Sequence, residues 1–355
     1  MKKLTFIIAS LLLIQTHSLW AQTASEMEFQ EYLGQNDFSG AVILQDAEGR
    51  LSTSTSGFSD LDEATPIKTQ DQFKIASITK LFTAVLVMQL VDEGSLSLED
   101  KVSAFLPDMK ITNAEDITIR HLLQHTSGLQ KESNISYLKS YSPDQLIVKF
   151  ATKKALFQPG EEFNYNNIDF VILGRIIEEI TDQTYQQVLT DRIIQPLGLN
   201  QTGLLTEKET KGKVVQAFQF KKSELKKEFN IHIENYWAAG SMYSTVGDLL
   251  TFTNALKTEE LISNASKVAL FESSPQRGYA ALGCWTFNSP FIPGSPKVME
   301  RRGEILGSTS AIMTSLDGPE TVIVLSNTDQ FNPDSFGNSE NIKEHLFKTL
   351  FTQKD

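Results

Sequence analysis

A serine and a lysine three residues apart stand at the start of a strongly apolar stretch with a helical pattern. Ser77 and Lys80 open this stretch, which covers residues 78–88. A three-residue step on a helix stacks the lysine one turn above the serine hydroxyl. These apolar surroundings remove water from the lysine amine, which lowers the pKa of the lysine from about 10.4 toward neutrality. The amine can then act as a base. The free N–H groups at a helix start also favour a developing oxyanion.

The Ser-x-x-Lys string alone carries little information. It recurs at Ser136/Lys139 and Ser223/Lys226, in polar and charged surroundings. A serine that caps a helix, followed by a lysine that reaches the surface, would give the same string at Ser77. Other motifs have to separate the catalytic reading from this structural one.

A tyrosine and an asparagine form the second candidate motif. Of eight tyrosines, only Tyr165 has an asparagine two residues later, Asn167, and the pair lies between a turn at residues 158–161 and a predicted helix. A phenol and a carboxamide held on a loop can relay a proton and hold a substrate amide. Alternatively, Asn167 caps the helix that follows.

The third candidate motif is Arg301-Arg302-Gly303-Glu304, at the end of a predicted strand. Gly303 permits close approach of a ligand to the backbone, and a basic side chain beside it can bind a carboxylate. A period of two places Arg301 and Gly303 on one face of the strand, and Arg302 and Glu304 on the other. Which face meets the substrate stays open from the sequence.

Two histidines, His121 and His125, are four residues apart, as two metal ligands on one helix face would be. The sequence has no His-Glu-x-x-His pattern and no evident third ligand. We therefore expect helix packing or capping from both, and no metal site. The absence of a Gly-x-Ser-x-Gly pattern also weakens a Ser-His-Asp hydrolase.

The elements that position these motifs are strands near both chain ends and helices between them. Alternation around a turn at residues 46–49 predicts a hairpin of strands 39–44 and 52–58. The other predicted strands are 279–287, 298–303, 309–314 and 321–327. Helical periodicity predicts helices at 78–93, 119–125, 144–153, 168–181, 185–194, 246–256 and 341–351.

This order predicts an α/β (α+β) fold, with an antiparallel sheet built from both chain ends and flanked by helices. A mostly helical insertion at about residues 94–235 would cover it. We expect one catalytic domain at residues 27–352, with the substrate in the cleft between sheet and insertion.

Composition restricts the partners. The 355 residues are 40% hydrophobic and 21% charged, which is typical of a globular chain, and the net charge is −12. Nucleic acid binding needs a basic face, so no nucleic-acid partner is expected. We expect a monomer.

The N-terminus has the layout of a secretory signal peptide. Lys2 and Lys3 precede an apolar run at residues 4–14, and a small residue, Ala21, offers a cleavage point. The run is too short for a permanent membrane anchor. We therefore predict a signal peptide at residues 1–21, a periplasmic or secreted protein, and no stable membrane anchor after cleavage. With Cys284 as its single cysteine, the chain cannot form an internal disulfide.

The three motifs occur in the order Ser-x-x-Lys, Tyr-x-Asn and basic-x-Gly. In these motifs and their order, the chain resembles the serine β-lactamase and penicillin-binding protein superfamily, in its class C β-lactamase-like branch. The resemblance covers about residues 27–350. It extends to four further sequence segments: residues 119–129, 195–199, 239–245 with Asp248 and Leu249, and 322–327.

The resemblance implies a role for each motif residue. Ser77 would be the nucleophile, Lys80 its proton acceptor, Tyr165 a second acid/base and Asn167 a contact to the substrate amide. The backbone N–H groups of Ser77 and Glu304 would form the oxyanion hole. The resemblance implies a small-molecule or peptidoglycan-type substrate and no cofactor.

Two residues depart from the branch. Arg301 stands where Lys or His is usual, and an arginine cannot donate a proton near neutral pH. Glu304 replaces a residue that is commonly small and adds a negative charge beside the oxyanion hole. Both changes disfavour efficient β-lactam hydrolysis.

The sequence thus predicts an exported serine hydrolase that forms an acyl-enzyme on amide or ester bonds, as a D,D-peptidase, β-lactamase or esterase does. The alternative is a catalytically silent peptidoglycan-binding or scaffold protein of the same fold. Intact Ser77, Lys80 and Tyr165 argue against that alternative.

Overall fold

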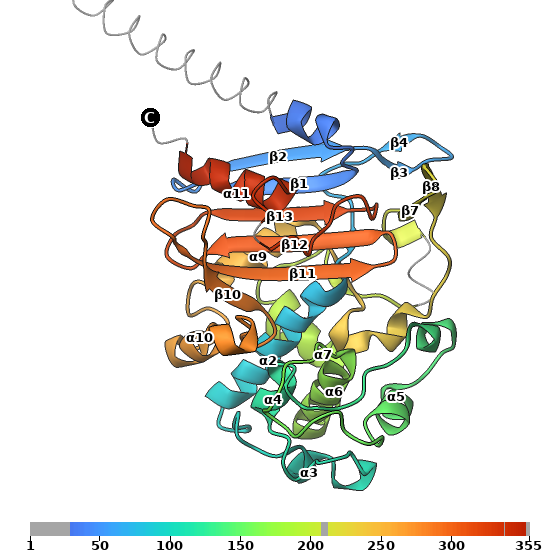
Figure 1. Cartoon of the computed structure of the whole chain (residues 1–355), viewed down its shortest axis with the longest axis vertical. Coiled ribbons are helices and arrows are strands. Elements are labelled where there is room, and N and C mark those ends of the chain that lie inside the picture. Colours follow the sequence, from blue (N-terminus) through green and yellow to red (C-terminus); the bar gives the residue numbers. More distant parts are fainter. Residues whose placement is uncertain (1–28, 207–211, 337, 353–355) are drawn as a thin grey trace, which may run out of the picture.

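Strand β1 (Gly40–Gln45), near the start of the chain, pairs antiparallel with β13 (Thr321–Ser326), near its end. Both belong to a six-stranded antiparallel sheet in the order β10-β11-β12-β13-β1-β2 (Figure 1). The other strands are β2 (Leu51–Ser56), β10 (Trp285–Asn288), β11 (Lys297–Ile305) and β12 (Ser308–Ser315). This structure, a computed structural model, describes residues 29–206, 212–336 and 338–352.

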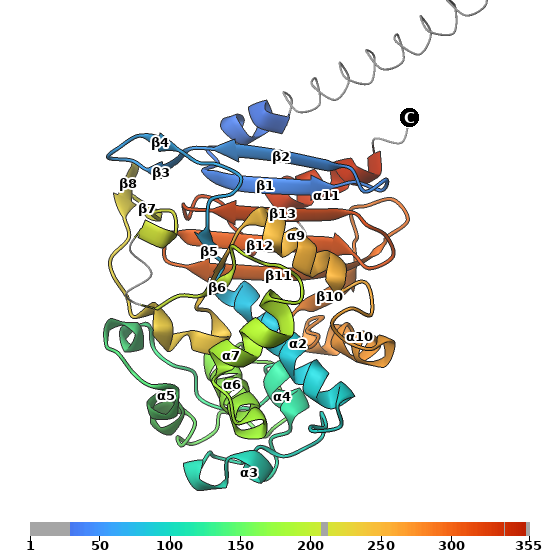
Figure 2. The ribbon, with the colours of Figure 1, turned by 180° about the vertical axis from the view of Figure 1, so that it is seen from behind.

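Successive residues of the central strands pack into two different hydrophobic cores, because successive side chains of a strand point to opposite faces of the sheet. One face packs beneath α11 (Ile342–Thr352) and the helical residues 29–35, and its core includes Val42, Val322 and Val324. The other face packs against α9 (Val246–Ala255) and the remaining helices, and its core includes Ile43 and Ile323. Figure 2 shows α9 on the face opposite α11.

Helix α2 (Thr79–Asp92) joins the sheet to the helical part of the molecule (Figure 2). It is buried on nearly all sides, as an apolar helix without a polar face must be. Its N-terminal turn, residues Ala76–Ile78, contacts β11 and β12, and its body contacts α6 (Asn167–Thr181), α7 (Tyr185–Leu189) and α10 (Asn264–Leu270). The remaining helices are α3 (Val102–Phe105), α4 (Ile119–Leu123) and α5 (Pro143–Phe150).

Three small sheets complete the fold. Strands β5 (Phe73–Lys74) and β6 (Gly203–Leu204) both pair with β9 (Met242–Ser244), next to α2. Two hairpins lie apart from this sheet: β3 (Phe58–Asp60) with β4 (Thr65–Pro66), and β7 (Phe218–Lys221) with β8 (Glu224–Lys227). Within the described residues, no helix is long and apolar enough to cross a membrane.

The predicted architecture, an antiparallel sheet assembled from both chain ends and flanked by helices, is confirmed. The strand predicted at 279–287 begins later than expected, because only Trp285–Asn288 pairs with β11. Gly283 has φ +75° and lies against the backbone of Lys80, so the chain turns there instead of extending. The helix predicted at 185–194 changes after Leu189 into a π turn.

Candidate active site

Ser77 lies in a tight turn that the surrounding elements hold in place. Its neighbour Ala76 has φ +48°, a left-handed conformation that is strained for a residue with a side chain. The hydroxyl of Thr79 donates to the Ala76 carbonyl at 2.7 Å and accepts from the Met242 amide at 3.2 Å. These bonds tie the turn to β9 and present the partly buried Ser77 side chain to a cavity.

Lys80 is fully buried and directs its amine toward Ser77. Its Nζ donates to Ser77 Oγ at 3.1 Å, to Asn167 Oδ1 at 2.6 Å and to the Ala239 carbonyl at 2.7 Å. Three acceptors match the three hydrogens of an ammonium group. Burial lowers the pKa of Lys80 to about 8, with the charge of Arg301 acting in the same direction. The amine is therefore still largely protonated at neutral pH.

Tyr165 approaches the serine from another side. Its phenolic oxygen lies 2.8 Å from Ser77 Oγ and receives a hydrogen bond from Arg301 Nη2 at 2.9 Å. Burial disfavours a phenolate, but the positive charges of Arg301 and Lys80 outweigh it and lower the pKa of Tyr165 to about 7. A tyrosine in this state can accept a proton near neutral pH.

The two arginines of the third motif have different surroundings. Arg301 is 1% exposed, and its Nε donates to the Ser77 carbonyl at 2.6 Å. Arg302 forms ion pairs with Glu300, at 3.0 Å, and with Asp334, and it lies on the cavity wall. Both guanidinium groups contact the ring of Trp285, at 5.1 and 4.6 Å from its centroid. Arg301 thus reaches the reacting groups, whereas Arg302 forms part of the rim.

Gly303 brings β11 against the serine turn. A Cβ at this position would lie 2.4 Å from the Ile75 carbonyl oxygen and 2.9 Å from the Ser77 nitrogen, so no larger residue fits without moving backbone. The side chain of Glu304 reaches solvent, but neighbouring atoms remove part of the hydration of its carboxyl group. Partial burial, and then the charges of Asp329 and Asp334, raise its pKa. This part of the cleft is therefore acidic.

Glu304 stands between two cavities. One, of about 410 Å³, contains Ser77 and is lined also by Phe163, Tyr165, Trp285, Arg302, Gly303, Glu304, Pro333 and Asp334. The other, of about 560 Å³, is mostly apolar and is lined by Ile135, Tyr137, Leu138, Gln219, Phe229, Ile231, Tyr236, Glu304, Ile305, Leu306 and Asp329.

Asn167 meets protein groups with both ends of its amide. Its Oδ1 accepts from Lys80, and its Nδ2 donates to Glu132 Oε1 at 2.6 Å and to Tyr137 Oη at 3.2 Å. The cap of α6 is Asn166, whose Oδ1 accepts from the Ile168 amide at 2.9 Å, so the alternative of Asn167 as the cap is wrong. Glu132 was not predicted as a site residue, since no motif marks it and only the tertiary contact reveals it.

A buried pair lies behind Tyr165. His125 Nδ1 is 3.3 Å from Asp169 Oδ2, and Asp169 Oδ1 accepts from the Ser127 hydroxyl at 2.6 Å. Burial raises the pKa of Asp169 well above its usual value and lowers the pKa of His125 well below its own, which favours the uncharged form of each side chain. The other histidine, His121, takes part in the N-terminal capping box of α4. Within the described residues, no group of three potential metal ligands occurs.

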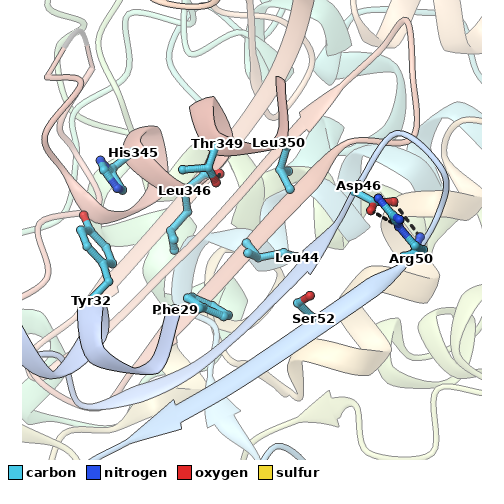
Figure 3. Close-up of a pocket in the computed structure, with 10 residues that line it drawn as sticks. All are labelled: Phe29, Tyr32, Leu44, Asp46, Arg50, Ser52, His345, Leu346, Thr349 and Leu350. Atoms are coloured by element: carbon cyan, nitrogen blue, oxygen red, sulfur yellow. Dashed lines mark hydrogen bonds and ion pairs between the residues drawn. The ribbon is translucent and has the colours of Figure 1, made fainter. Parts of the chain in front are cut away.

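A further pocket of about 180 Å³ contains none of the predicted site residues. It lies between helical residues 29–35, the β1–β2 hairpin and α11, where Tyr32 stacks on His345 (Figure 3). Arg50 at its rim is already paired with Asp46 at 2.6 Å. The pocket is therefore separate from the Ser77 cleft.

Comparison with known proteins agrees with this fold. Residues 27–347 match the Beta-lactamase family, and the chain belongs to that family. Penicillin-binding protein 4* of Bacillus subtilis is 27% identical over 329 residues, which cover 84% of this chain and 70% of that protein. Penicillin-binding protein 4 of Amycolatopsis lactamdurans is 29% identical over 208 residues, but this chain spans only 52% of its length.

Solved structures with the same fold include an amidohydrolase and a staphylococcal protein. A D-stereospecific amidohydrolase from Streptomyces superposes with a TM-score of 0.72 at 25% identity, covering 86% of this chain and 94% of that one. FmtA of Staphylococcus aureus superposes with a TM-score of 0.77 at 21% identity, covering 93% and 89%. The family match and the fold together show that this chain is a hydrolase of the serine β-lactamase and penicillin-binding protein type.

Proposed function

We propose that this chain is an exported hydrolase that forms an acyl-enzyme at Ser77 and releases the acyl group to water. The observation that carries the proposal is the placement of Ser77 Oγ between Lys80 Nζ at 3.1 Å and Tyr165 Oη at 2.8 Å. A nucleophile within hydrogen-bond reach of a base, and a base oriented by a third group, is the arrangement that covalent catalysis needs.

In the acylation step, the Tyr165 phenolate takes the proton of the Ser77 hydroxyl while Oγ bonds to the substrate carbonyl carbon. Lys80 remains an ammonium, because its three hydrogens already have acceptors. The backbone N–H groups of Ser77 and Glu304 hold the oxyanion of the tetrahedral intermediate. Collapse breaks the bond to the leaving amine or alcohol, which takes the proton from Tyr165.

In the deacylation step, a water gives its proton to Tyr165 and attacks the ester carbonyl. The bond to Ser77 Oγ breaks, and the proton returns from Tyr165 to the serine. Each cycle thus consumes one water and regenerates both side chains, without a cofactor.

The charges of the cleft favour neutral or amine-bearing substrates over anionic ones. Arg302, which could bind a carboxylate, is already paired with Glu300 and Asp334. Glu304 adds a negative charge where the cavity containing Ser77 meets the apolar cavity. We therefore propose slow turnover of β-lactams, which carry a carboxylate, and faster turnover of neutral esters and D-amino-acid amides.

The test is the hydrolysis of a p-nitrophenyl ester, a D-amino-acid amide and a chromogenic cephalosporin by wild type and Ser77→Ala. We expect ester or amide kcat/KM to exceed that for the cephalosporin, and Ser77→Ala to lose all three activities by several orders of magnitude. A folded wild type that binds these compounds without turning any over would instead indicate a silent binding protein.

Export is proposed from the leader at residues 1–21, which lies outside the described residues. N-terminal sequencing of the exported protein should find a start at or near Gln22. Soluble protein in the cytoplasm with an intact Met1 would contradict this proposal.

A further inference from the structure

We infer that Glu132 is a positioning residue, which acts through Asn167 to hold Lys80 in its charged form beside Ser77. The inference rests on the proposed acyl-enzyme function and extends it to a side chain that no motif marks. It also assigns Asn167 a role other than the substrate contact that the resemblance implied.

The three side chains form one chain of hydrogen bonds. Glu132 Oε1 accepts from Asn167 Nδ2 at 2.6 Å, and Asn167 Oδ1 accepts from Lys80 Nζ at 2.6 Å. A carboxylate at one end and an ammonium at the other polarise the amide in the same direction, and such chains strengthen cooperatively. A flipped amide would turn its NH₂ group toward the ammonium and its oxygen toward the carboxylate. The charges therefore fix the orientation of Asn167.

Both hydrogens of the Asn167 amide are used within the protein. Glu132 takes one, and the oxygen of Tyr137, at 3.2 Å, takes the other. No hydrogen remains to donate to a substrate carbonyl while these contacts persist. In this arrangement Asn167 orients Lys80 and does not bind the substrate.

Neighbouring segments hold Glu132 in place. The Tyr137 hydroxyl donates to Glu132 Oε1, and the Tyr137 ring stacks on Tyr236 with centroids 3.7 Å apart and planes 2° from parallel. Asn235 Nδ2 donates to the Ser136 and Lys139 carbonyls at 3.0 and 2.6 Å. The segment that holds Glu132 is thereby joined to the segment that supplies the Ala239 carbonyl to Lys80.

The other charged groups around Ser77 explain why the negative charge of Glu132 matters. Lys80 and Arg301 are both buried basic side chains, and burial raises the pKa of the nearby Asp169 well above its usual value, which favours its uncharged form. Burial raises the pKa values of Tyr137 and Tyr236, so both stay uncharged phenols. Tyr165 titrates near pH 7 and cannot supply a constant negative charge. Glu132 Oε2 is closed off from solvent and has no hydrogen-bond partner, whereas Oε1 accepts from Asn167 and Tyr137, so the carboxylate is linked to Lys80 through the Asn167 amide.

Loss of the Glu132 charge should therefore change the pH dependence of acylation. Burial lowers the pKa of Lys80 to about 8, and Glu132 opposes that shift. In Glu132→Gln, the pKa of Lys80 should fall further, so the ammonium loses its proton at a lower pH. A step that needs the ammonium beside the phenolate then declines earlier as the pH rises.

The experiment measures the rate of Ser77 acylation by a fluorophosphonate from pH 6 to 10, with KM and kcat for a neutral and an amine-bearing ester. We expect Glu132→Gln to move the alkaline limb to lower pH, to lose roughly tenfold in acylation rate at pH 8, and to leave KM for both esters within twofold. Glu132→Asp keeps the negative charge, so its alkaline limb should lie between those of Glu132→Gln and wild type. Tyr137→Phe keeps the stack on Tyr236 and should give a smaller shift in the same direction.

The matched control is Glu179→Gln, which removes one charge from the exposed surface of α6, the helix that Asn167 begins. Its profile should match that of wild type. If Glu132→Gln does not fold, as judged by near-UV circular dichroism, Tyr137→Phe carries the test, and an unmoved limb in that variant contradicts the inference.

Three results would overturn it. The pH profile of folded Glu132→Gln could superimpose on that of wild type, or its acylation could become faster at neutral pH, which would make neutral Lys80 the base. KM could instead rise for the amine-bearing ester alone, which would make Glu132 a direct substrate contact. A wild type that is not labelled at Ser77 would contradict the acyl-enzyme proposal itself, which keeps the two failures distinct.

Discussion

Arg301 Nη2 donates a hydrogen bond to the phenolic oxygen of Tyr165 at 2.9 Å, so a permanent positive charge touches the group proposed to accept the serine proton. Arginine is the most basic side chain, whereas the lysine or histidine that is usual at this position in the β-lactamase-like branch can give up its proton more readily. Its Nε is bonded to the Ser77 carbonyl at 2.6 Å. Arginine at this position therefore stabilises the phenolate form of Tyr165 as a base, and Arg301 itself cannot act as a proton donor.

Arg301→Ala should move the rising limb of the pH–rate profile to higher pH. The base is active as a phenolate, so activity rises with pH through the pKa of Tyr165, which is about 7. Without the guanidinium, burial dominates and raises this pKa. We expect a loss of roughly tenfold or more in kcat/KM at pH 7, partly recovered at pH 9. Arg301→Lys, which keeps a positive charge, should shift the limb less; equal limbs in all three proteins would contradict the role.

Glu304→Gln should improve acylation by anionic substrates. The Glu304 carboxylate lies on the wall of the cavity that contains Ser77, close enough to Asp329 and Asp334 for their charges to raise its pKa. Removal of one exposed charge is worth roughly 1 kcal/mol, or about fivefold in kcat/KM for a cephalosporin. The p-nitrophenyl ester, which is neutral, serves as the control and should change by less than twofold. Equal changes for both substrates would show that the carboxylate does not act through charge.

Gly303→Ala should strongly slow acylation, because its Cβ would meet backbone atoms of Ile75 and Ser77 and push β11 away from the serine turn. We expect a loss of roughly 10²-fold or more in the rate of Ser77 labelling, comparable with the loss of an oxyanion-hole donor. Gly247→Ala is the matched control, since a Cβ at that exposed position of α9 has only one contact, at 3.9 Å. Unimpaired labelling of folded Gly303→Ala would show that the close approach is dispensable.

Asp169→Asn should flatten the dependence of stability on pH. The raised pKa of Asp169 means that the folded state holds a proton that the unfolded chain releases above about pH 4. This contribution to stability is complete below that pH and is lost as the pH rises toward the folded pKa. Asparagine mimics the neutral acid, accepting from Ser127 and donating to His125. Urea unfolding at pH 5, 7 and 9 should show a smaller decline for Asp169→Asn; parallel declines would mean that Asp169 is ionised in the fold.

Regular elements with a strong pattern were predictable from the sequence. The apolar stretch after Ser77 predicts a helix at 78–93, and α2 covers Thr79–Asp92. The hairpin around residues 46–49 and the strand predicted at 321–327 likewise match β1, β2 and β13 within a few residues. In these segments a single pattern of burial determines the structure.

Elements without such a pattern were missed. The β7–β8 hairpin is lysine-rich and mostly exposed, and each of its strands has only four residues, so its alternation of apolar and polar residues is too short to stand out in the sequence. The segment at 279–287 has the apolar residues of a strand, but the close contact of Gly283 with α2 bends it. Glu132 resembles any surface acid in the sequence, because its contact with Asn167 depends on two segments that only the fold brings together.

Intact-mass spectrometry after incubation with a fluorophosphonate tests the central claim, a nucleophilic Ser77, most directly. Wild type should gain one adduct, peptide mapping should place it on Ser77, and Ser77→Ala should gain none. A labelled penicillin should give the same adduct site but react more slowly. An adduct that persists in folded Ser77→Ala, or a folded wild type that gains none with either reagent, would contradict the account.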